Sequence, residues 1–443
     1  ARLMGGALLR RALGPAPALL LTGCSMPQSG VDSLLAPPLL NEEQNEIYAA
    51  LVRETGDSIK LLYPQRGENR SAFLVINLDA EVTSEAVAFY QSTASTVTSA
   101  IHMAVLDKRD GGWQSVHDIS LEGTQVEDIS VMRAGGDSLL AVGLGYSSDN
   151  TSLLKIYSFN GSTMDEIYSQ SYQTKIISDL NSDDTDDVLL ITPVSKNGNS
   201  YGRLYTYRNG RFRPDSEVLL DPAFTRYANI TDGYLVNGQR AIYLDGYRGS
   251  TLMSTEILGY EEEAGLVNLT YDPEAGQRYA IDRALGAVCY DTNRDGVIEV
   301  PGLTLMPGYT EEVSGAVYLT DWYHFLNGEY EKVKSSYVSS SQGYMLDFPE
   351  RWVGEVSIRR TVRANETLFY EYQGGDSPVK SELLYILMAK RSDWEAGEFP
   401  DYELIDSAGG GQIVYLAKIP EQEEYNPLAV NLTEVKKNFN RYY

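Results

Sequence analysis

A two-residue turn signal recurs along this chain and constrains its fold more than any other feature. An Asx-Gly pair follows a strand-like apolar run at Asp110-Gly111, Asn160-Gly161, Asn209-Gly210 and Asn327-Gly328. Ala264-Gly265 takes the expected place between the last two pairs. Asn-Gly and Asp-Gly favour two-residue hairpin turns because both positions need positive φ. The spacing therefore predicts antiparallel strands arranged in a repeated unit of about 50 residues.

Each interval between these turns has room for about four short strands. In the first unit the apolar segments are residues 72–78, 85–90, 101–106 and 113–119. One four-stranded sheet cannot bury both of its faces alone, so the units are expected to stack. We predict a mainly β fold in which a β-propeller has about five four-stranded blades. Six or seven blades remain open because the interval from 210 to 328 is stretched, and an array of β-sandwiches is the alternative fold.

The remaining sequence divides around this repeat. Residues 25–56 predict a tether and then a helix over 41–54, where Asn41 is a suitable N-cap and Gln44 stands three positions later. The propeller is predicted over 57–342. From residue 343 the turn rhythm stops, and 343–443 predicts a separate small α+β domain with a terminal helix near residues 433–439.

The first 24 residues predict export. Three arginines precede the apolar run 13–21, and small residues then lead to Cys24. A basic start, a short apolar stretch and small residues are typical of a secretory signal peptide. The apolar run is too short to span a bilayer, which needs about 20 residues.

The segment Leu21-Thr22-Gly23-Cys24 resembles the bacterial lipobox. That resemblance implies that Cys24 carries a palmitate-type lipid and becomes the first residue of the mature chain. The protein is then expected to be a lipoprotein of the cell membrane, held by its lipid at the extracytoplasmic face.

Charge and cysteine content limit the possible partners and covalent links. The net charge of −26 argues against nucleic acid as a partner, since phosphates require Lys and Arg. It suits a soluble extracellular body, and it also suits loops that bind calcium. The chain has two cysteines, so lipid on Cys24 leaves Cys289 without an intramolecular disulfide. We expect Cys289 to be a buried small hydrophobic residue.

Two nine-residue acidic loops predict structural Ca²⁺ sites. Their proposed ligands are Asp291, Asn293, Asp295, Val297 and Glu299 in one loop, and Asp179, Asn181, Asp183, Thr185 and Asp187 in the other. Side chains at the first, third and fifth positions can converge on one ion, the seventh residue offers its carbonyl, and the ninth closes the shell. A solvated acidic turn is the alternative for both loops.

The two loops differ at the sixth position, where the chain turns sharply. Gly296 permits this turn, whereas Asp184 is only tolerated in the left-handed region. We therefore expect weaker binding in the loop that contains Asp184. Neither loop is an EF-hand, since the twelfth position is Gly302 in one and Leu190 in the other.

The loops and phased turns resemble the FG-GAP or VCBS repeats of integrin-type propellers over about residues 70–340. The resemblance extends faintly to residues 77–85, which lack the glycine, and the equivalent places near 133–137 and 229–233 have lost most acids. With its leader, helix and 348–352 segment, the chain is similar to a Firmicutes lipoprotein group of unassigned role. The resemblance implies an architecture and not an activity.

Signals for catalysis are weak. Residues 198–202 match the Gly-x-Ser-x-Gly elbow by letter, but they form a polar turn between two strands. His102, His117 and His324 show no metal-binding spacing. We therefore predict a non-catalytic extracytoplasmic binding or scaffold protein whose partner is an unknown envelope protein or a glycan. A cell-surface enzyme that acts on glycans is the alternative, and a purely structural envelope protein is a third.

Overall fold

The computed structural model describes residues 40–94, 100–146, 151–192, 198–311, 315–375 and 377–442. The expected signal peptide, Cys24 and most of the tether lie outside these residues. Within them, no helix is long and apolar enough to cross a membrane. The prediction of a mainly β chain is confirmed, and the strands form several antiparallel sheets.

Six sheets of four or five strands follow one another along the described part of the chain. The first contains β1 (Ile59–Leu61), β2 (Phe73–Ile76), β3 (Glu85–Ser92), β4 (Ile101–Arg109) and β5 (Gly112–Leu121). The second contains β6 (Gln125–Ala134), β7 (Asp137–Gly145), β8 (Ser152–Phe159) and β9 (Met164–Tyr172). The third contains β10 (Thr174–Ser178), β11 (Asp187–Ile191), β12 (Tyr201–Arg208) and β13 (Arg211–Leu219).

The later sheets are less regular. The fourth contains β14 (Arg226–Tyr234), β15 (Arg240–Arg248), β16 (Leu252–Glu261), β17 (Gly265–Asn268) and β20 (Arg283–Ala284), and a hairpin of β18 (Tyr271–Asp272) and β19 (Gln277–Arg278) follows β17. The fifth contains β21 (Val300–Leu305), β22 (Tyr318–Leu326), β23 (Glu329–Ser339), β24 (Tyr344–Asp347) and β30 (Phe439–Arg441). The sixth contains β25 (Val356–Arg360), β26 (Glu366–Tyr372), β27 (Val379–Lys390), β28 (Glu403–Ala408) and β29 (Ile413–Lys418).

Helices are few and short in the described chain. They are α2 (Glu42–Thr55), α3 (Arg391–Glu395) and α4 (Leu432–Asn438), with the 3₁₀ turns η1 (Glu350–Trp352) and η2 (Gly409–Gly411). The expected N-cap Asn41 begins α2, and its side chain accepts from the backbone of Gln44 while the Gln44 side chain accepts from the backbone of Asn41. This reciprocal pair satisfies two donors that the first helical turn leaves free.

The predicted turns lie in five different sheets, and each joins two neighbouring strands. At Asp110-Gly111, Asn209-Gly210 and Asn327-Gly328 both residues have positive φ, between 52° and 80°. Asn160-Gly161 differs from the prediction, because Phe159 pairs with Met164 and the loop has four residues. The Asn160 side chain accepts from the backbone of Ser162 and Thr163, so a local Asx-type turn replaces the two-residue hairpin.

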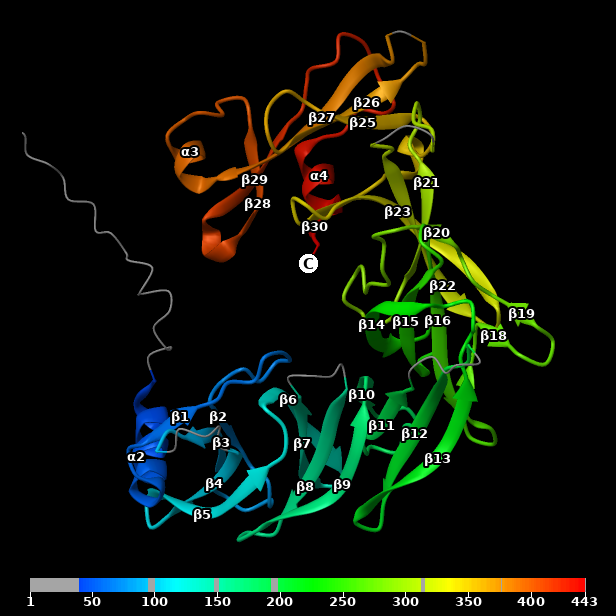
Figure 1. The fold of residues 1–443 in the computed structure, drawn as a ribbon. Coiled ribbons are helices and arrows are strands. Elements are labelled where there is room, and N and C mark those ends of the chain that lie inside the picture. Colours follow the sequence, from blue (N-terminus) through cyan, green and yellow to red (C-terminus); the bar gives the residue numbers. More distant parts are fainter. Residues whose placement is uncertain are drawn as a thin grey trace, which may run out of the picture.

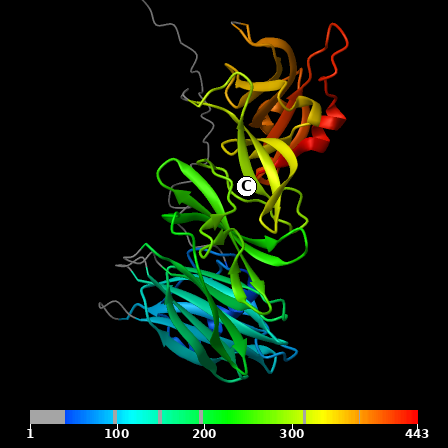
Figure 2. The ribbon, with the colours of Figure 1, turned by 90° about the vertical axis from the view of Figure 1, so that its right-hand side faces the viewer.

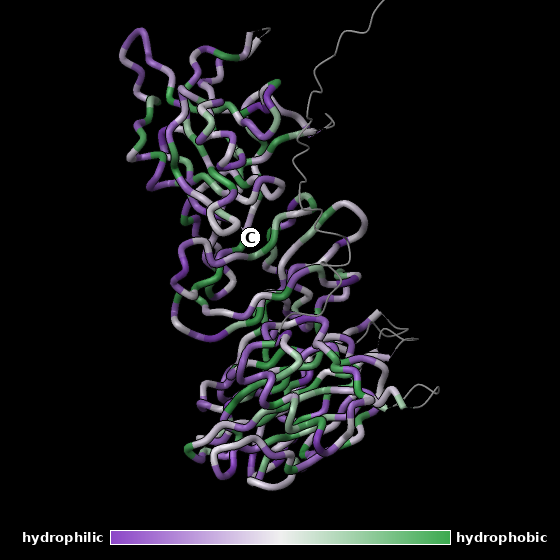
Figure 3. Tube along the Cα trace, turned by 90° about the vertical axis from the view of Figure 1, so that its left-hand side faces the viewer, coloured by the Kyte–Doolittle hydropathy of each residue, from purple (hydrophilic) through white to green (hydrophobic). Residues whose placement is uncertain are grey.

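Consecutive sheets pack face to face, and alternate residues of one strand serve two different cores. In β8, Leu153 and Tyr157 belong to the core shared with the first sheet, whereas Leu154 and Ile156 belong to the core shared with the third. Similar cores join the third sheet to the fourth, the fourth to the fifth and the fifth to the sixth. Figure 3 shows hydrophobic stretches along the strands and hydrophilic ones at many turns. Side chains alternate between the two faces along a strand. A strand of a sheet that lies between two other sheets therefore needs apolar residues on both faces.

The two ends of this stack are covered by helical segments. Ile47 and Leu51 of α2 pack on Ala88 and Leu106, which lie on the face of the first sheet that points away from the second. On the far face of the sixth sheet, Leu416 packs with the region around α3. Figure 1 shows the sheets in an open arc, and Figure 2 shows the sixth sheet at the opposite end from the first. Blade-like sheets are therefore present, but closure into a ring is not observed, because α2 occupies the face that a closing blade would need.

The expected domain boundary at 342/343 cuts through the fifth sheet. β24 pairs with β23 and also with the C-terminal strand β30. One core contains Leu319 and Tyr337 from the fifth sheet with Phe369 and Ile386 from the sixth. The segment after residue 343 therefore shares a sheet and a core with the preceding part of the chain, in contrast to the prediction of a separate domain. The terminal helix is present as α4, one residue earlier than expected.

Candidate functional site

Three loops occupy similar positions, each just before a strand of a sheet. They are residues 77–84 before β3, residues 179–186 before β11 and residues 291–298 before β21, where Tyr290 bridges to Glu299. The loop that starts at Asp179 lies between the first two strands of its sheet, as predicted, whereas the loop that starts at Asp291 precedes the first strand of its sheet and follows only an isolated bridge. Of the two other expected equivalents, 133–137 spans the turn between β6 and β7, and 229–233 lies inside β14, where the turn comes later, at 235–239.

The three loops share a left-handed backbone conformation at the fourth position. Their fourth residues, Ala80, Ser182 and Arg294, have φ of 61°, 59° and 65°. At the sixth position Asp184 has φ 63° and Gly296 has φ 86°, so Asp184 adopts the left-handed conformation that glycine adopts without steric cost.

In the loop that starts at Asp291, the side chains at the first, third and fifth positions turn inward. Asp291 accepts from the backbone N–H groups of Arg294 at 2.6 Å and of Gly296 at 2.9 Å. Asn293 accepts from the backbone of Asp295 at 3.1 Å, and Asp295 accepts from the backbone of Val297 at 2.8 Å. This last bond, with help from Asn293, lowers the pKa of the Asp295 carboxyl and so favours its anionic form.

The loop that starts at Asp179 repeats this pattern. Asp179 accepts from the backbone of Asp183 and Asp184, at 3.0 and 3.1 Å. Asp183 accepts from the backbone of Thr185 at 3.0 Å, and the Asn181 amide donates to Asp183 at 3.1 Å. In the loop that starts at Asp291, the equivalent hydrogen bond from the Asn293 amide to Asp295 measures 2.9 Å. The proposed ligands of each loop are therefore brought together by local hydrogen bonds.

The ninth residue of each loop is a buried acid with the same backbone partner. Glu85, Asp187 and Glu299 are at most 1% exposed. Each accepts a hydrogen bond from the N–H of the second loop residue, at 2.6 Å from Leu78, 3.1 Å from Leu180 and 2.9 Å from Thr292. Glu85, which belongs to the fainter first loop, is an acid that the sequence patterns did not single out as a ligand.

The second oxygen of this buried acid differs between the two acidic loops. In the loop that starts at Asp291, Oε1 of Glu299 lies 3.3 Å from Nε2 of His324. In the other loop, Oδ1 of Asp187 is buried and has no hydrogen-bond partner among the described residues. Burial is the main cause that raises the pKa of the Asp187 carboxyl, to about 7. An unpartnered buried oxygen is costly, and a cation beside it would relieve that cost.

Both acidic loops also attach to the sheet before their own. The backbone N–H of Asp186 donates to Arg133 at 2.9 Å, and the Arg133 guanidinium reaches Asp186 at 2.9 Å. In the other loop Ile298 donates to Tyr234 at 3.1 Å, and Tyr234 donates to Gly296 at 2.8 Å. Each loop therefore lies on a seam between two consecutive sheets.

The donor set suits Ca²⁺, although the described residues contain no ready cluster of three His, Cys, Asp or Glu side chains that could hold a metal. Carboxylate and amide oxygens stand at the first, third, fifth and ninth positions, and Val297 or Thr185 can add a backbone carbonyl. The observation that most directly supports a cation in these loops is the buried oxygen of Asp187 that has no hydrogen-bond partner among the described residues.

The residues with possible catalytic roles are engaged in structural contacts. Ser200 donates its hydroxyl to the carbonyl of Thr192, and strand β12 follows it where an elbow would need a helix. His117 accepts from the backbone of Met164 at 2.8 Å, and His102 lies 2.7 Å from Asp118. This geometry gives no support to a nucleophile elbow.

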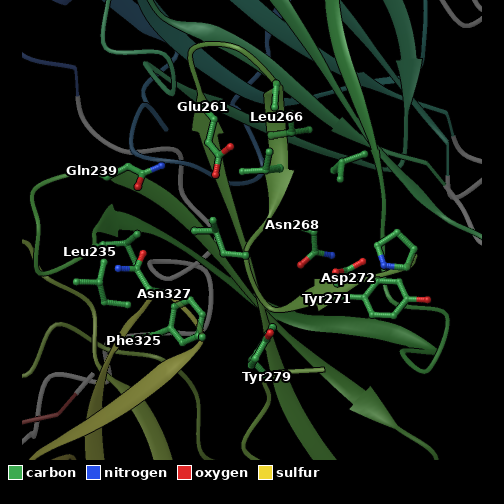
Figure 4. A pocket seen from close by; sticks show the side chains of 17 residues that line it. Leu235, Gln239, Glu261, Leu266, Asn268, Tyr271, Asp272, Tyr279, Phe325 and Asn327 are labelled. Atoms are coloured by element: carbon green, nitrogen blue, oxygen red, sulfur yellow. The ribbon is translucent and has the colours of Figure 1, made fainter. Parts of the chain in front are cut away.

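A cavity of about 630 Å³ lies between the fourth and fifth sheets (Figure 4). Strand β17, the β18–β19 hairpin and the turn between β22 and β23 contribute to its walls. Its lining combines aromatic, aliphatic, amide and carboxylate side chains, among them Leu235, Gln239, Glu261, Asn268, Tyr279 and Asn327. The sequence pattern did not identify this cavity, although the stretched turn spacing between residues 210 and 328 coincides with the inserted hairpin.

Comparisons with known proteins give remote similarities only. No family model matches the chain, and no curated protein matches it. A rhamnogalacturonan lyase of Bacillus licheniformis has 11% identity and a TM-score of 0.30, with 62% of this chain and 70% of that chain covered. A functionally unknown protein from Desulfotomaculum acetoxidans has 13% identity and a TM-score of 0.31, with 74% and 89% covered. At these values the similarities identify neither a family nor an activity.

Proposed function

We propose that this protein is a non-catalytic extracytoplasmic binding or scaffold protein whose stacked sheets are stabilised by Ca²⁺. Each sheet serves as a propeller-type blade of FG-GAP or VCBS kind, and two acidic loops hold one ion each. The ligands are the ten residues named from the sequence, with Asp291 to Glu299 binding more tightly than Asp179 to Asp187.

The observation that carries this proposal is the position of the acidic loops on the seams between sheets. Asp186 contacts Arg133 of the second sheet, and Ile298 contacts Tyr234 of the fourth. An ion that orders such a loop would stabilise both a turn and the packing of two blades. Binding to the folded state alone adds about 2.7 kcal/mol at a hundredfold excess over the dissociation constant. The role of Ca²⁺ is therefore structural.

The extracytoplasmic location rests on the sequence alone. The basic and apolar leader and the lipobox-like segment at Cys24 support export and a lipid anchor at the cell membrane. The net charge of −26 suits a body exposed to solvent, with an envelope protein or a glycan as partner and without nucleic acid.

Thermal unfolding in calcium and in chelator tests the proposal. We expect the wild-type protein to melt at a lower temperature in chelator, because the loop carboxylates then repel one another. Asp295→Ala should remove most of this difference and Asp183→Ala a smaller part. Asp57→Ala changes an exposed acid outside the loops and serves as the matched control. A wild-type melting curve that is identical in calcium and chelator would refute the structural role of Ca²⁺.

A further inference from the structure

An insertion forms one wall of the cavity between the fourth and fifth sheets. Residues 269–290 separate β17 from the acidic loop that starts at Asp291 and contain the β18–β19 hairpin. The other connections between consecutive sheets are short. An insertion that departs from the repeat and forms a cavity wall is a typical place for a binding site in a repeat protein.

The hairpin is held by contacts with the segment that joins the third sheet to the fourth and with the fifth sheet. Arg278 donates two hydrogen bonds to the buried carboxylate of Asp221, at 2.6 and 2.8 Å. The Arg278 guanidinium also lies 5.1 Å from the centre of the Tyr271 ring. The backbone of Tyr279 donates to Thr270 at 2.9 Å, and its carbonyl accepts from Tyr330 at 2.8 Å. The cavity wall is therefore fixed before any ligand arrives, which limits the entropic cost of binding.

The cavity offers ring faces and polar groups together. Figure 4 shows Glu261 and Tyr279 on opposite sides, with their oxygen atoms directed into the space between them. Asn327 lies at a third side, on the turn that follows Phe325. The volume of about 630 Å³ falls within the range of roughly 300–1,000 Å³ that is usual for small-molecule sites.

The charges of the lining exclude some ligand classes. Its ionisable acids are Glu261 and Asp272, and it includes no Lys or Arg, so an anionic ligand would find no cation to pair with. A purely apolar ligand would cover the Asn327 amide and the Tyr279 hydroxyl without giving them hydrogen-bond partners. Both carboxylates belong to exposed residues, and Asp272 already accepts from the backbone of Glu274 and Ala275. A cation would therefore find no desolvated charge to recognise.

We propose that this cavity binds an uncharged saccharide, one or two sugar residues of a longer glycan. A sugar ring presents an apolar face to an aromatic side chain and hydroxyl groups at its edge to amides and carboxylates. This inference rests on the proposed function as a binding protein and assigns the ligand class of one site. Glu261 accepts hydrogen bonds from the sugar hydroxyls, Asn327 accepts or donates them, and Tyr279 supplies a ring and a hydroxyl.

Calorimetric titration of the full chain tests this assignment. The probes are cellotriose, maltotriose and chitotriose as neutral ligands, with trigalacturonic acid as the anionic probe and spermidine as the cationic one. We expect at least one neutral trisaccharide to bind, and we expect trigalacturonic acid and spermidine to bind more weakly. Absence of binding by all three neutral trisaccharides, or tighter binding of spermidine, would overturn the inference.

Variants tie the binding to the cavity. Tyr279→Ala should weaken binding about tenfold or more, as loss of a central aromatic contact does. Glu261→Gln should weaken binding because it replaces a carboxylate that accepts from the sugar. The melting temperature should stay the same because Glu261 is exposed. Tyr425→Ala removes a tyrosine that is 92% exposed and lies outside the cavity, and it serves as the control. Sugar binding that is unchanged in both Tyr279→Ala and Glu261→Gln would place the site elsewhere.

The calcium response separates the two proposals. A protein that melts at a lower temperature in chelator but binds no neutral sugar retains its calcium-stabilised scaffold and lacks the site assigned to the cavity. A protein that binds sugar and is indifferent to chelator retains the site and lacks the structural role of Ca²⁺.

Discussion

Asp245 and Arg283 form an ion pair in which neither side chain is exposed to solvent, with 2.6 Å between Oδ1 and Nη2. Asp245 also accepts from the Thr255 hydroxyl at 2.7 Å and from the backbone of Cys289 at 2.8 Å. It thus links β15 and β16 of the fourth sheet to the segment that leads into the fifth. Cys289 is buried as expected, and it also donates its thiol to Asp245 at 3.2 Å.

Removal of this carboxylate should be strongly destabilising. Asp245→Asn leaves the Arg283 guanidinium buried without a charge partner, and such a loss usually costs about 3–5 kcal/mol of unfolding free energy. Chemical denaturation measures the change. Asp232→Asn is the matched control, because Asp232 pairs with Arg240 on a part-exposed surface, where ion pairs contribute about 1 kcal/mol or less. A loss below about 1 kcal/mol for Asp245→Asn would contradict the expectation.

Glu256 should make stability depend on pH near neutrality. It is fully buried, and burial is the main cause that raises its pKa to about 7. Between its ordinary value of 4.5 and 7, the folded state holds a proton that the unfolded state has lost. The unfolding free energy should therefore fall as pH rises through this window, by up to about 1.4 kcal/mol per pH unit, and level off above it.

Glu256→Gln should remove the part of this slope that comes from Glu256, while Asp187, whose pKa is also raised to about 7, keeps its own part. The amide keeps an oxygen that can accept from the backbone of Asp221 and a nitrogen that can donate to the Tyr227 hydroxyl. Denaturant unfolding at pH 5, 6, 7 and 8 measures the effect, with the exposed Glu331→Gln as control. Parallel stability curves for the wild type and Glu256→Gln over this range would count against a raised pKa.

The fragment 343–443 should not fold alone. It loses Met306, Leu319 and Tyr337, which share a core with its own Phe369. It also loses β23, the partner of β24. We expect no cooperative thermal transition from this fragment, whereas 287–443, which keeps the fifth sheet, should show one. A cooperative melt of 343–443 by itself would restore the boundary expected from the sequence.

Lipid attachment predicts a clear change in cell fractionation. Cys24→Ala should release the protein from the membrane fraction and lower its mass by that of the lipid, because Cys24 is the proposed acylation site. Cys289→Ala alters the other cysteine, which is buried, and should leave membrane association intact. Retention of Cys24→Ala in the membrane at its original mass would show that the anchor lies elsewhere.

Features formed by neighbouring residues could be predicted from the sequence. The turns at Asn209-Gly210 and Asn327-Gly328, the cap at Asn41 and the two acidic loops all depend on contacts across a few positions. Their conformations follow from backbone sterics and from side chains that bond to nearby backbone groups. The sequence therefore determined the strand repeat, its phase and the geometry within each candidate calcium loop.

The contacts that join distant segments were decided only by the tertiary structure. His324 faces Glu299 across 25 positions, and Arg133 meets Asp186 across 53. No local pattern encodes such pairs, because they depend on which sheet edges become neighbours. The same holds for α2 on the first sheet, which leaves the arc open, and for the shared core that crosses residue 343. An apolar face of a sheet must be covered by another element. Only the packing of the whole chain determines whether that element is a helix or another sheet.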